Sequence, residues 1–141
     1  MTQECCTENQ EIMILACSGC SNLGQLANQA VVELTREGFG RMSCLAGLGA
    51  QLSNFVKSAQ NAPRLIAIDG CPVSCGQKIL ENAGVPLRCH VVLYDLGIEK
   101  TKNTVLDPAE VEKVKTAVKG ECSGNVSLVG VNAGPSRSCC G

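Results

Sequence analysis

Cysteines with the spacing of metal ligands are the most informative feature of this 141-residue chain, which contains 11 cysteines. Cys17 and Cys20 form a Cys-x-x-Cys pair, Cys71 and Cys75 form a Cys-x-x-x-Cys pair, and Cys44 lies between the two pairs. Two chelating pairs are typical of thiolate sites for zinc, and iron–sulfur clusters use the same donors. The alternative is that these cysteines are buried in the core as small apolar side chains.

The positions of three of these cysteines indicate that they meet. Each follows a strand-like apolar run: residues 12–16 lead into Cys17, residues 40–43 into Cys44 and residues 65–70 into Cys71. In an open parallel sheet the carboxyl ends of the strands line one crevice, where ligands bind. We therefore expect the three thiols to converge there. Cys75, one helical turn after Cys71, is expected to face the same crevice, and Cys20 is a further candidate.

Expected helix starts lie beside these thiols. Cys17 precedes the first expected helix, and Cys71 and Cys75 lie at the start of the third. The free amides and the dipole of a helix N-terminus favour negative charge, and metal binding requires the thiolate form. The same setting also suits thiol redox chemistry, so it does not choose between the two.

The rest of the chain predicts the scaffold for such a crevice. Short apolar runs alternate with segments of helical period, which predicts an α/β fold: a three-layer, doubly wound parallel sheet of about four strands, flavodoxin- or Rossmann-like. We favour the strand order 2-1-3-4, because it places the first and third strands side by side at the switch point where ligands collect. The expected helices cover residues 21–38, 50–59, 72–84 and 107–120, and the fourth strand covers residues 90–94.

One domain is expected over residues 11–120, between flexible segments at residues 1–10 and 121–141. The C-terminal segment contains Cys122 and the vicinal pair Cys139 and Cys140. A flexible dithiol could carry a soft metal, a metalloid or a sulfur atom to or from the central site. An equally weighted alternative is that these cysteines are exposed thiols without such a role.

Four motifs resemble the DGC domain family of small bacterial and archaeal proteins, named after an Asp-Gly-Cys sequence. They lie within residues 12–100 and are Cys17-Ser18-Gly19, Met42-Ser43-Cys44-Leu45-Ala46-Gly47, Asp69-Gly70-Cys71-Pro72-Val73-Ser74-Cys75 and Asp95-Leu96-Gly97-Ile98-Glu99-Lys100. The resemblance implies zinc held by four cysteines, which map to Cys17, Cys44, Cys71 and Cys75. Cys20 is not among the defining ligands of that family. The resemblance implies no reaction, so enzymatic activity is left open.

Several residues near the strand ends could support the cysteine site. Asp69 and Asp95 end the third and fourth strands, and Asp69 could orient a ligand or hold the Gly70 turn. The simpler interpretation of both is a turn-forming carboxylate without a chemical task. Lys100 could offset the charge of a thiolate cluster but is more simply an exposed surface lysine.

Two residues at the far end of the fourth strand are excluded from the site. Cys89 is five residues from Tyr94, or roughly 17 Å along a strand. It should therefore not reach the crevice. His90, its neighbour, is expected to be a surface or strand-end residue.

Composition narrows the function classes. The chain has 12 basic and 13 acidic residues, no Trp, one Tyr and two Phe, so a nucleic-acid partner is improbable. No apolar run is long enough to span a membrane. The N-terminus is polar and no secretion signal follows it, so we expect a cytoplasmic protein. In that reducing compartment, clustered cysteines favour metal or redox chemistry over disulfides.

Three function classes remain, in this order. The first is a zinc-binding domain that serves structure, metal handling or sensing. The second is an iron–sulfur protein acting in sulfur chemistry. The third is a thiol redox or sulfur-transfer protein without a permanent metal, which uses Cys17, Cys20 and the terminal dithiol.

Overall fold

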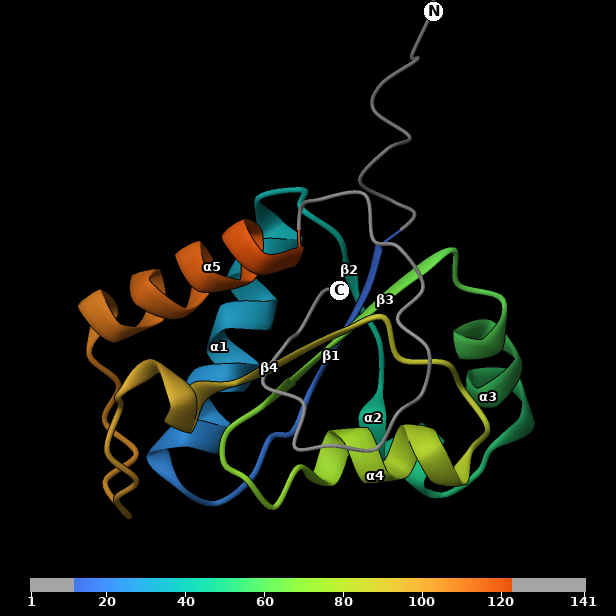
Figure 1. Ribbon diagram of the computed structural model, residues 1–141, viewed down its shortest axis with the longest axis horizontal. Helices are drawn as coiled ribbons and strands as arrows, with labels where there is room; N and C mark the ends of the chain where they lie inside the picture. The colour runs from blue at the N-terminus through green and yellow to red at the C-terminus, as the bar shows by residue number, and fades with distance from the viewer. Residues whose placement is uncertain (1–11, 123–141) are drawn as a thin grey trace, which may run out of the picture.

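The computed structural model describes residues 12–122, in which four strands form one all-parallel sheet (Figure 1). The strands are β1 (Ile12–Ala16), β2 (Arg41–Met42), β3 (Arg64–Asp69) and β4 (Cys89–Val92). Their order in the sheet is β2-β1-β3-β4. The α/β class and the strand order 2-1-3-4 predicted from the sequence are thus confirmed.

Helices cover both faces of the sheet and make the fold three-layered (Figure 1). One face packs against α1 (Asn22–Arg36) and α5 (Pro108–Cys122), and the other against α2 (Leu45–Gly49), α3 (Ser53–Gln60) and α4 (Cys75–Asn82). A 3₁₀ helix, η2 (Leu93–Leu96), follows β4. Within residues 12–122, no helix combines the length and the apolar character that crossing a membrane requires.

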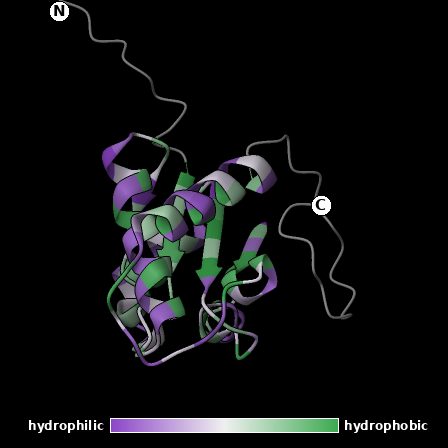
Figure 2. Ribbon diagram, turned by 90° about the vertical axis from the view of Figure 1, so that its left-hand side faces the viewer, coloured by the Kyte–Doolittle hydropathy of each residue, from purple (hydrophilic) through white to green (hydrophobic). Residues whose placement is uncertain are grey.

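The sequence of β1 explains why it is covered on both sides. Ile12 and Ile14 pack into the core on the α1 and α5 face, whereas Met13 and Leu15 pack into the core on the opposite face. Successive side chains of a strand point to opposite faces, so a continuous apolar run suits a sheet buried on both. Figure 2 shows these hydrophobic strands between helices of mixed hydropathy.

Two helices differ from the pattern predicted by periodicity. The helix expected over residues 50–59 begins at Ser53 as α3, and an additional short helix, α2, precedes it; Gln51, with a φ of 55°, separates the two. The third expected helix begins at Cys75 instead of Pro72, because Ser74 has a φ of 54°. Left-handed residues interrupt a right-handed helix, and single-residue preferences do not reveal them.

Two other elements end elsewhere than predicted. β4 ends at Val92 instead of Tyr94, so Asp95 lies on the 3₁₀ helix η2. Helix α5 extends to Cys122, which therefore belongs to a helix and not to the expected flexible segment.

A disulfide joins Cys89 at the start of β4 to Cys122 at the end of α5, with a Cα–Cα distance of 6.0 Å. Both residues are buried, and Arg64 Nη2 donates to the Cys122 carbonyl oxygen at 2.6 Å. For this pair, the expectation that the cysteines favour metal or redox chemistry over disulfides is wrong. The bond joins the end of α5 to the amino end of β4, at the opposite end of the sheet from the carboxyl ends of the strands.

Reduction of the Cys89–Cys122 disulfide is expected to lower the free energy of unfolding by about 3 kcal/mol, because the bond restricts the unfolded chain across a sequence separation of 33 residues. Urea unfolding with and without dithiothreitol measures the change. A double variant, Cys89→Ala with Cys122→Ala, should lose the response to dithiothreitol. If the double variant responds as the wild type does, the effect comes from other cysteines.

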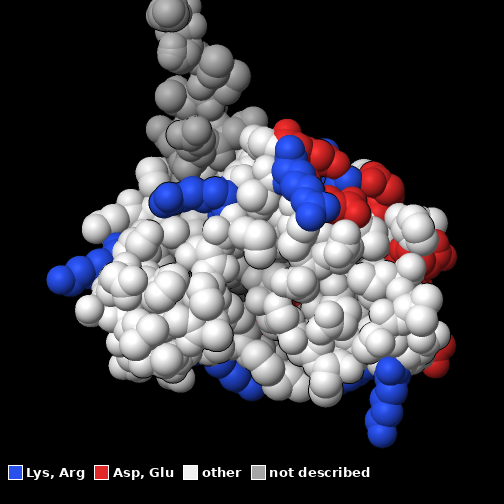
Figure 3. All heavy atoms as spheres, turned by 180° about the vertical axis from the view of Figure 1, so that it is seen from behind, with Lys and Arg blue, Asp and Glu red and all other residues white. Residues whose placement is uncertain are grey.

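Ion pairs also fasten α5, in this case to α1. The ammonium group of Lys115 lies 3.0 Å from Glu33 Oε2 and 2.7 Å from Glu112 Oε1, and it also pairs with Glu37. Hydrogen bonds to Glu112, Glu37 and Glu33 raise the pKa of Lys115, which stays charged although its side chain is buried. Figure 3 shows acidic and basic side chains gathered in this region. The three carboxylates lie close enough together to hold a cation, and Lys115 already fills that role.

Candidate metal centre

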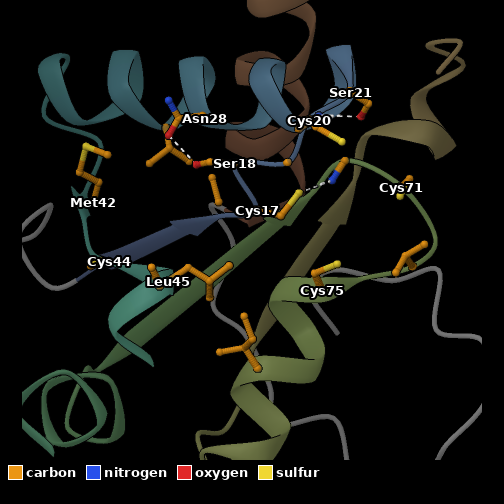
Figure 4. A pocket seen from close by; sticks show the side chains of 18 of the residues that line it. Cys17, Ser18, Cys20, Ser21, Asn28, Met42, Cys44, Leu45, Cys71 and Cys75 are labelled. Carbon is orange, nitrogen blue, oxygen red and sulfur yellow. Dashed lines mark hydrogen bonds between the residues drawn. The ribbon is translucent and has the colours of Figure 1, made fainter. Parts of the chain in front are cut away.

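A pocket of about 970 Å³ lies at the carboxyl ends of the first three strands. All of the cysteines that are free within residues 12–122 line it, and these are Cys17, Cys20, Cys44, Cys71 and Cys75. They come from the β1–α1 turn, the start of α2 and the β3–α4 turn. Figure 4 shows four of them around one end of the pocket, with Cys44 set apart from the others. The strand ends thus bring together, in one pocket, the cysteines whose convergence was expected.

The sulfur atoms are more widely spaced than a single bound ion would hold them. In the described part of the chain, no three of these sulfurs lie within 4.8 Å of one another. Zinc–sulfur bonds of about 2.3 Å in a tetrahedron place the sulfurs about 3.8 Å apart. Cys20, Cys44 and Cys75 are exposed, so their side chains are free to change rotamer. The donor set therefore fits a thiophilic metal, provided that side chains rotate towards a common point.

Hydrogen-bond donors already point at three of the sulfurs. The Gly70 amide donates to Cys17 Sγ at 3.1 Å, and the Gly47 amide donates to Cys44 Sγ at 3.3 Å. Lys100 Nζ donates to Cys71 Sγ at 3.5 Å. Such donors are the usual second-sphere partners of thiolate ligands. Cys17, Cys44 and Cys71 are the three cysteines expected at the strand ends.

Cys17 is partly buried in the pocket lining. Burial raises the pKa of the Cys17 thiol, and the nearby Asp69 and Cys75 raise it further, whereas the Gly70 and Gly19 amides lower it. The net effect is a raised pKa, which favours the thiol at neutral pH. A reactive cysteine nucleophile needs the opposite shift, whereas a metal cation brings the charge that favours the thiolate.

Asp69 is a buried carboxylate that holds the start of α4. It accepts hydrogen bonds from the Gly76 amide at 2.7 Å and the Gln77 amide at 3.1 Å. The N-cap residue of α4, Ser74, makes no side-chain capping bond, so Asp69 satisfies the free amides in its place. Asp69 thereby fixes the helical turn that carries Cys75, instead of only forming a turn at Gly70.

His90 is the second partner of this carboxylate. Its Nε2 lies 2.7 Å from Asp69 Oδ2, and the histidine is buried. A surface position for this histidine is therefore wrong, although His90 does lie near the start of β4, as the strand-end alternative expected. Burial by itself would raise the pKa of Asp69, but the hydrogen bonds from His90, Gly76 and Gln77 outweigh it, and the net pKa is lowered. Asp69 is accordingly ionised at neutral pH.

Acidification is expected to destabilise the metal-free protein below about pH 4. The folded-state pKa of Asp69 lies below its unfolded value of about 3.9, so the unfolded chain binds more protons there. The contribution of Asp69 is complete above that value and is lost as the pH falls through the folded-state pKa. Urea unfolding over this pH range should show the loss, and Asp69→Asn should flatten it. An unchanged pH profile in Asp69→Asn would contradict this role, and Asp95→Asn serves as the matched control.

Lys100 reaches the pocket because the segment that carries it is tied to α1. The Asn22 side chain donates to the Glu99 carbonyl oxygen at 2.8 Å and accepts from the Thr101 amide at 2.7 Å. Lys100 is exposed, as expected, and it also contacts Cys71. Asn22, which is buried, was not identified from the sequence, because an asparagine at a helix start is usually only a capping residue.

The other candidate residues lie elsewhere. Asp95 is exposed on η2 and is not among the residues that line the pocket, so the structure provides no support for its expected role at the site. Cys89 lies outside the pocket lining and is bridged to Cys122. Cys139 and Cys140 fall outside the described residues.

Comparison with known proteins places the chain in a family. The family model described as the DGC domain matches residues 13–118. The chain belongs to the DGC domain family. It is similar to the anaerobic and virulence modulator AnvM of Pseudomonas aeruginosa, with 33% identity over 102 residues, which cover 72% of this chain and 78% of AnvM. No solved structure matches the chain.

Each residue of the Asp-Gly-Cys motif has a distinct structural task in this DGC domain. Asp69 holds the first turn of α4. Gly70 lets the β3–α4 turn approach α1, since a Cβ at this position would lie 2.8 Å from the Gly24 nitrogen. Cys71 lines the pocket. The glycine therefore allows the turn that carries Cys71 to lie against the start of α1, next to the turn that carries Cys17.

Proposed function

We propose that this DGC domain binds a thiophilic metal ion, zinc in the first place, through Cys17, Cys44, Cys71 and Cys75, with Cys20 as an additional thiol. The observation that carries the proposal is the set of hydrogen-bond donors aimed at the sulfurs of Cys17, Cys44 and Cys71. A core cysteine needs no such donors, whereas a thiolate ligand gains from them.

The charge balance of the pocket supports the same function. Four thiolates around zinc carry a net charge of −2, and Lys100 contributes a positive charge next to Cys71. A bound ion would supply the positive charge that keeps a partly buried sulfur such as that of Cys17 ionised. We propose a role in the handling or sensing of a metal, a metalloid or sulfur, in the cytoplasm, where the exposed thiols stay reduced.

An iron–sulfur cluster is the second candidate, and one observation favours it. The cysteine sulfurs are spaced too widely for any three to lie within 4.8 Å of one another. A cluster is larger than a single ion, so its ligands are set farther apart. AnvM is named an anaerobic and virulence modulator, and an oxygen-sensitive thiolate site would suit a similar role here.

A thiol redox or sulfur-transfer protein without metal is the third candidate. It requires Cys17 as a nucleophile, and the raised pKa of Cys17 counts against that role. Cys139 and Cys140 remain predicted transfer thiols for any of the three functions.

Titration with cobalt(II) under anaerobic, reducing conditions tests the metal site and its ligands. Tetrahedral thiolate coordination should give thiolate-to-cobalt charge transfer and intense visible bands, which zinc then removes by displacing cobalt. The Cys44→Ser variant should weaken cobalt binding, whereas Cys20→Ser should leave it unchanged. If Cys20→Ser loses cobalt binding and Cys44→Ser does not, the fourth ligand is Cys20 and not Cys44. No cobalt spectrum in the wild type would contradict metal binding by these thiols.

A further inference from the structure

The pocket is much larger than a metal site and has a second kind of wall. Its volume of about 970 Å³ is comparable to that of pockets that enclose small organic molecules. Besides the thiols, it is lined by large apolar side chains, which are Val31, Met42, Leu45, Phe55, Val73 and Ile79. Four thiolates around one ion would leave this part of the pocket unused.

The polar side chains of the lining are largely paired within the chain. Ser18 Oγ donates to Asn28 Oδ1 at 2.9 Å, and Ser21 Oγ accepts from the Gly24 amide at 3.3 Å. Among residues 12–122, Lys100 is the one charged residue of the lining, and its ammonium group is at Cys71. The apolar wall therefore offers little to a charged or polyhydroxylated ligand, because such a ligand would lose hydration without gaining partners.

The wall is preformed and in part exposed. The Phe55 ring packs against Gly47 so closely that a Cβ on Gly47 would lie 2.6 Å from a ring carbon. Leu45 and Ile79 pack, together with Phe55, against the buried core on this face of the sheet. At the rim, Met42 is 44% exposed and Val73 is 52% exposed. A ligand that covered these side chains would remove apolar surface from water without reorganising the wall.

We propose that the pocket binds the apolar body of a small, uncharged aryl or alkyl compound against Leu45, Phe55 and Ile79, beside the cysteines. This second binding function goes beyond metal binding and does not depend on which metal the thiols hold. It requires only that the apolar wall and the thiols belong to one pocket.

Two maleimides that share the same reactive group and differ in the substituent on nitrogen test the proposal on the reduced, metal-free full chain. A cysteine thiol adds across the maleimide double bond, so that a carbon–sulfur bond forms and the thiol proton ends on the neighbouring carbon. The reaction rates of N-phenylmaleimide and N-methylmaleimide are measured at each pocket cysteine by peptide mass spectrometry. The ratio of the phenyl rate to the methyl rate is then divided by the same ratio for glutathione, which corrects for intrinsic reactivity. This corrected ratio should be about ten, since the phenyl ring is partly buried before reaction. A corrected ratio near one at every pocket cysteine would overturn the proposal.

Variants of the wall locate the effect. Phe55→Ala should lower the corrected ratio at least about threefold. Val73→Ser should lower it in the same direction, and its exposed position makes unfolding an improbable cause. Val105→Ser is the matched control, because Val105 is apolar and 83% exposed but does not line the pocket. A ratio that neither wall variant changes, or that Val105→Ser lowers equally, would overturn the assignment. Cobalt binding is a separate readout, so the failure of either function leaves the other testable.

Discussion

Replacement of Asp69 by alanine is expected to lower the free energy of unfolding by about 3 kcal/mol or more. The substitution removes the acceptor of the buried Gly76 amide, of the partly buried Gln77 amide and of the buried His90 Nε2. Each buried donor that loses its acceptor costs about 1–3 kcal/mol. Urea unfolding of the metal-free protein measures the change.

The same substitution should also weaken metal binding, because Asp69 fixes the first turn of α4, where Cys75 lies. Asp69→Asn should be milder, since an amide oxygen still accepts from the backbone. Asp95→Ala is the matched control and should change stability by less than about 0.5 kcal/mol, because Asp95 is exposed on η2. Equal losses from Asp69→Ala and Asp95→Ala would show that the buried network contributes nothing.

Replacement of Cys71 by serine is expected to lower the affinity for zinc or cobalt by about a hundredfold or more. Loss of a hydrogen-bond partner of a metal ligand typically lowers the metal affinity about 10- to 100-fold, and loss of the ligand itself should lower it at least as much. Serine leaves the fold largely intact, because Cys71 is only partly buried in the pocket lining. Competition titration against a chromophoric chelator measures the affinity.

Cys89→Ser provides the contrast for Cys71→Ser. It breaks the disulfide with Cys122 and should lower stability, but it should leave metal affinity within about twofold, because Cys89 lies outside the pocket lining. If both variants lose metal to the same extent, the pocket cysteines are not the ligands, and the placement of the metal at the strand ends is wrong.

The scaffold was predictable because its determinants are local. Residues 12–16 form a strand whose alternate side chains enter both cores, and the strands that precede Cys17, Cys44 and Cys71 place these residues at the carboxyl end of the sheet. The strand order followed from the preference of ligands for the switch point. Positive φ values at Gln51 and Ser74 were not predictable, because non-glycine residues seldom adopt them.

The Asp69–His90 contact depends on register, which the sequence does not display. His90 pairs with Ala67, two residues before Asp69, and side chains two residues apart on neighbouring strands share a face. A shift of one residue would have turned His90 to the other face. The Cys89–Cys122 pairing likewise depends on the return of α5 to β4, for which no local pattern exists.

Metal and acid-labile sulfide analysis, with an absorption spectrum, tests the central claim most directly on protein purified without oxygen. We expect a colourless protein that carries one zinc per chain and no sulfide, and that loses zinc in the Cys71→Ser variant. A brown protein that contains iron and sulfide would show that the site holds an iron–sulfur cluster in place of zinc. A wild-type protein that carries neither metal, and takes up no zinc when zinc is added, would contradict metal binding at the strand ends.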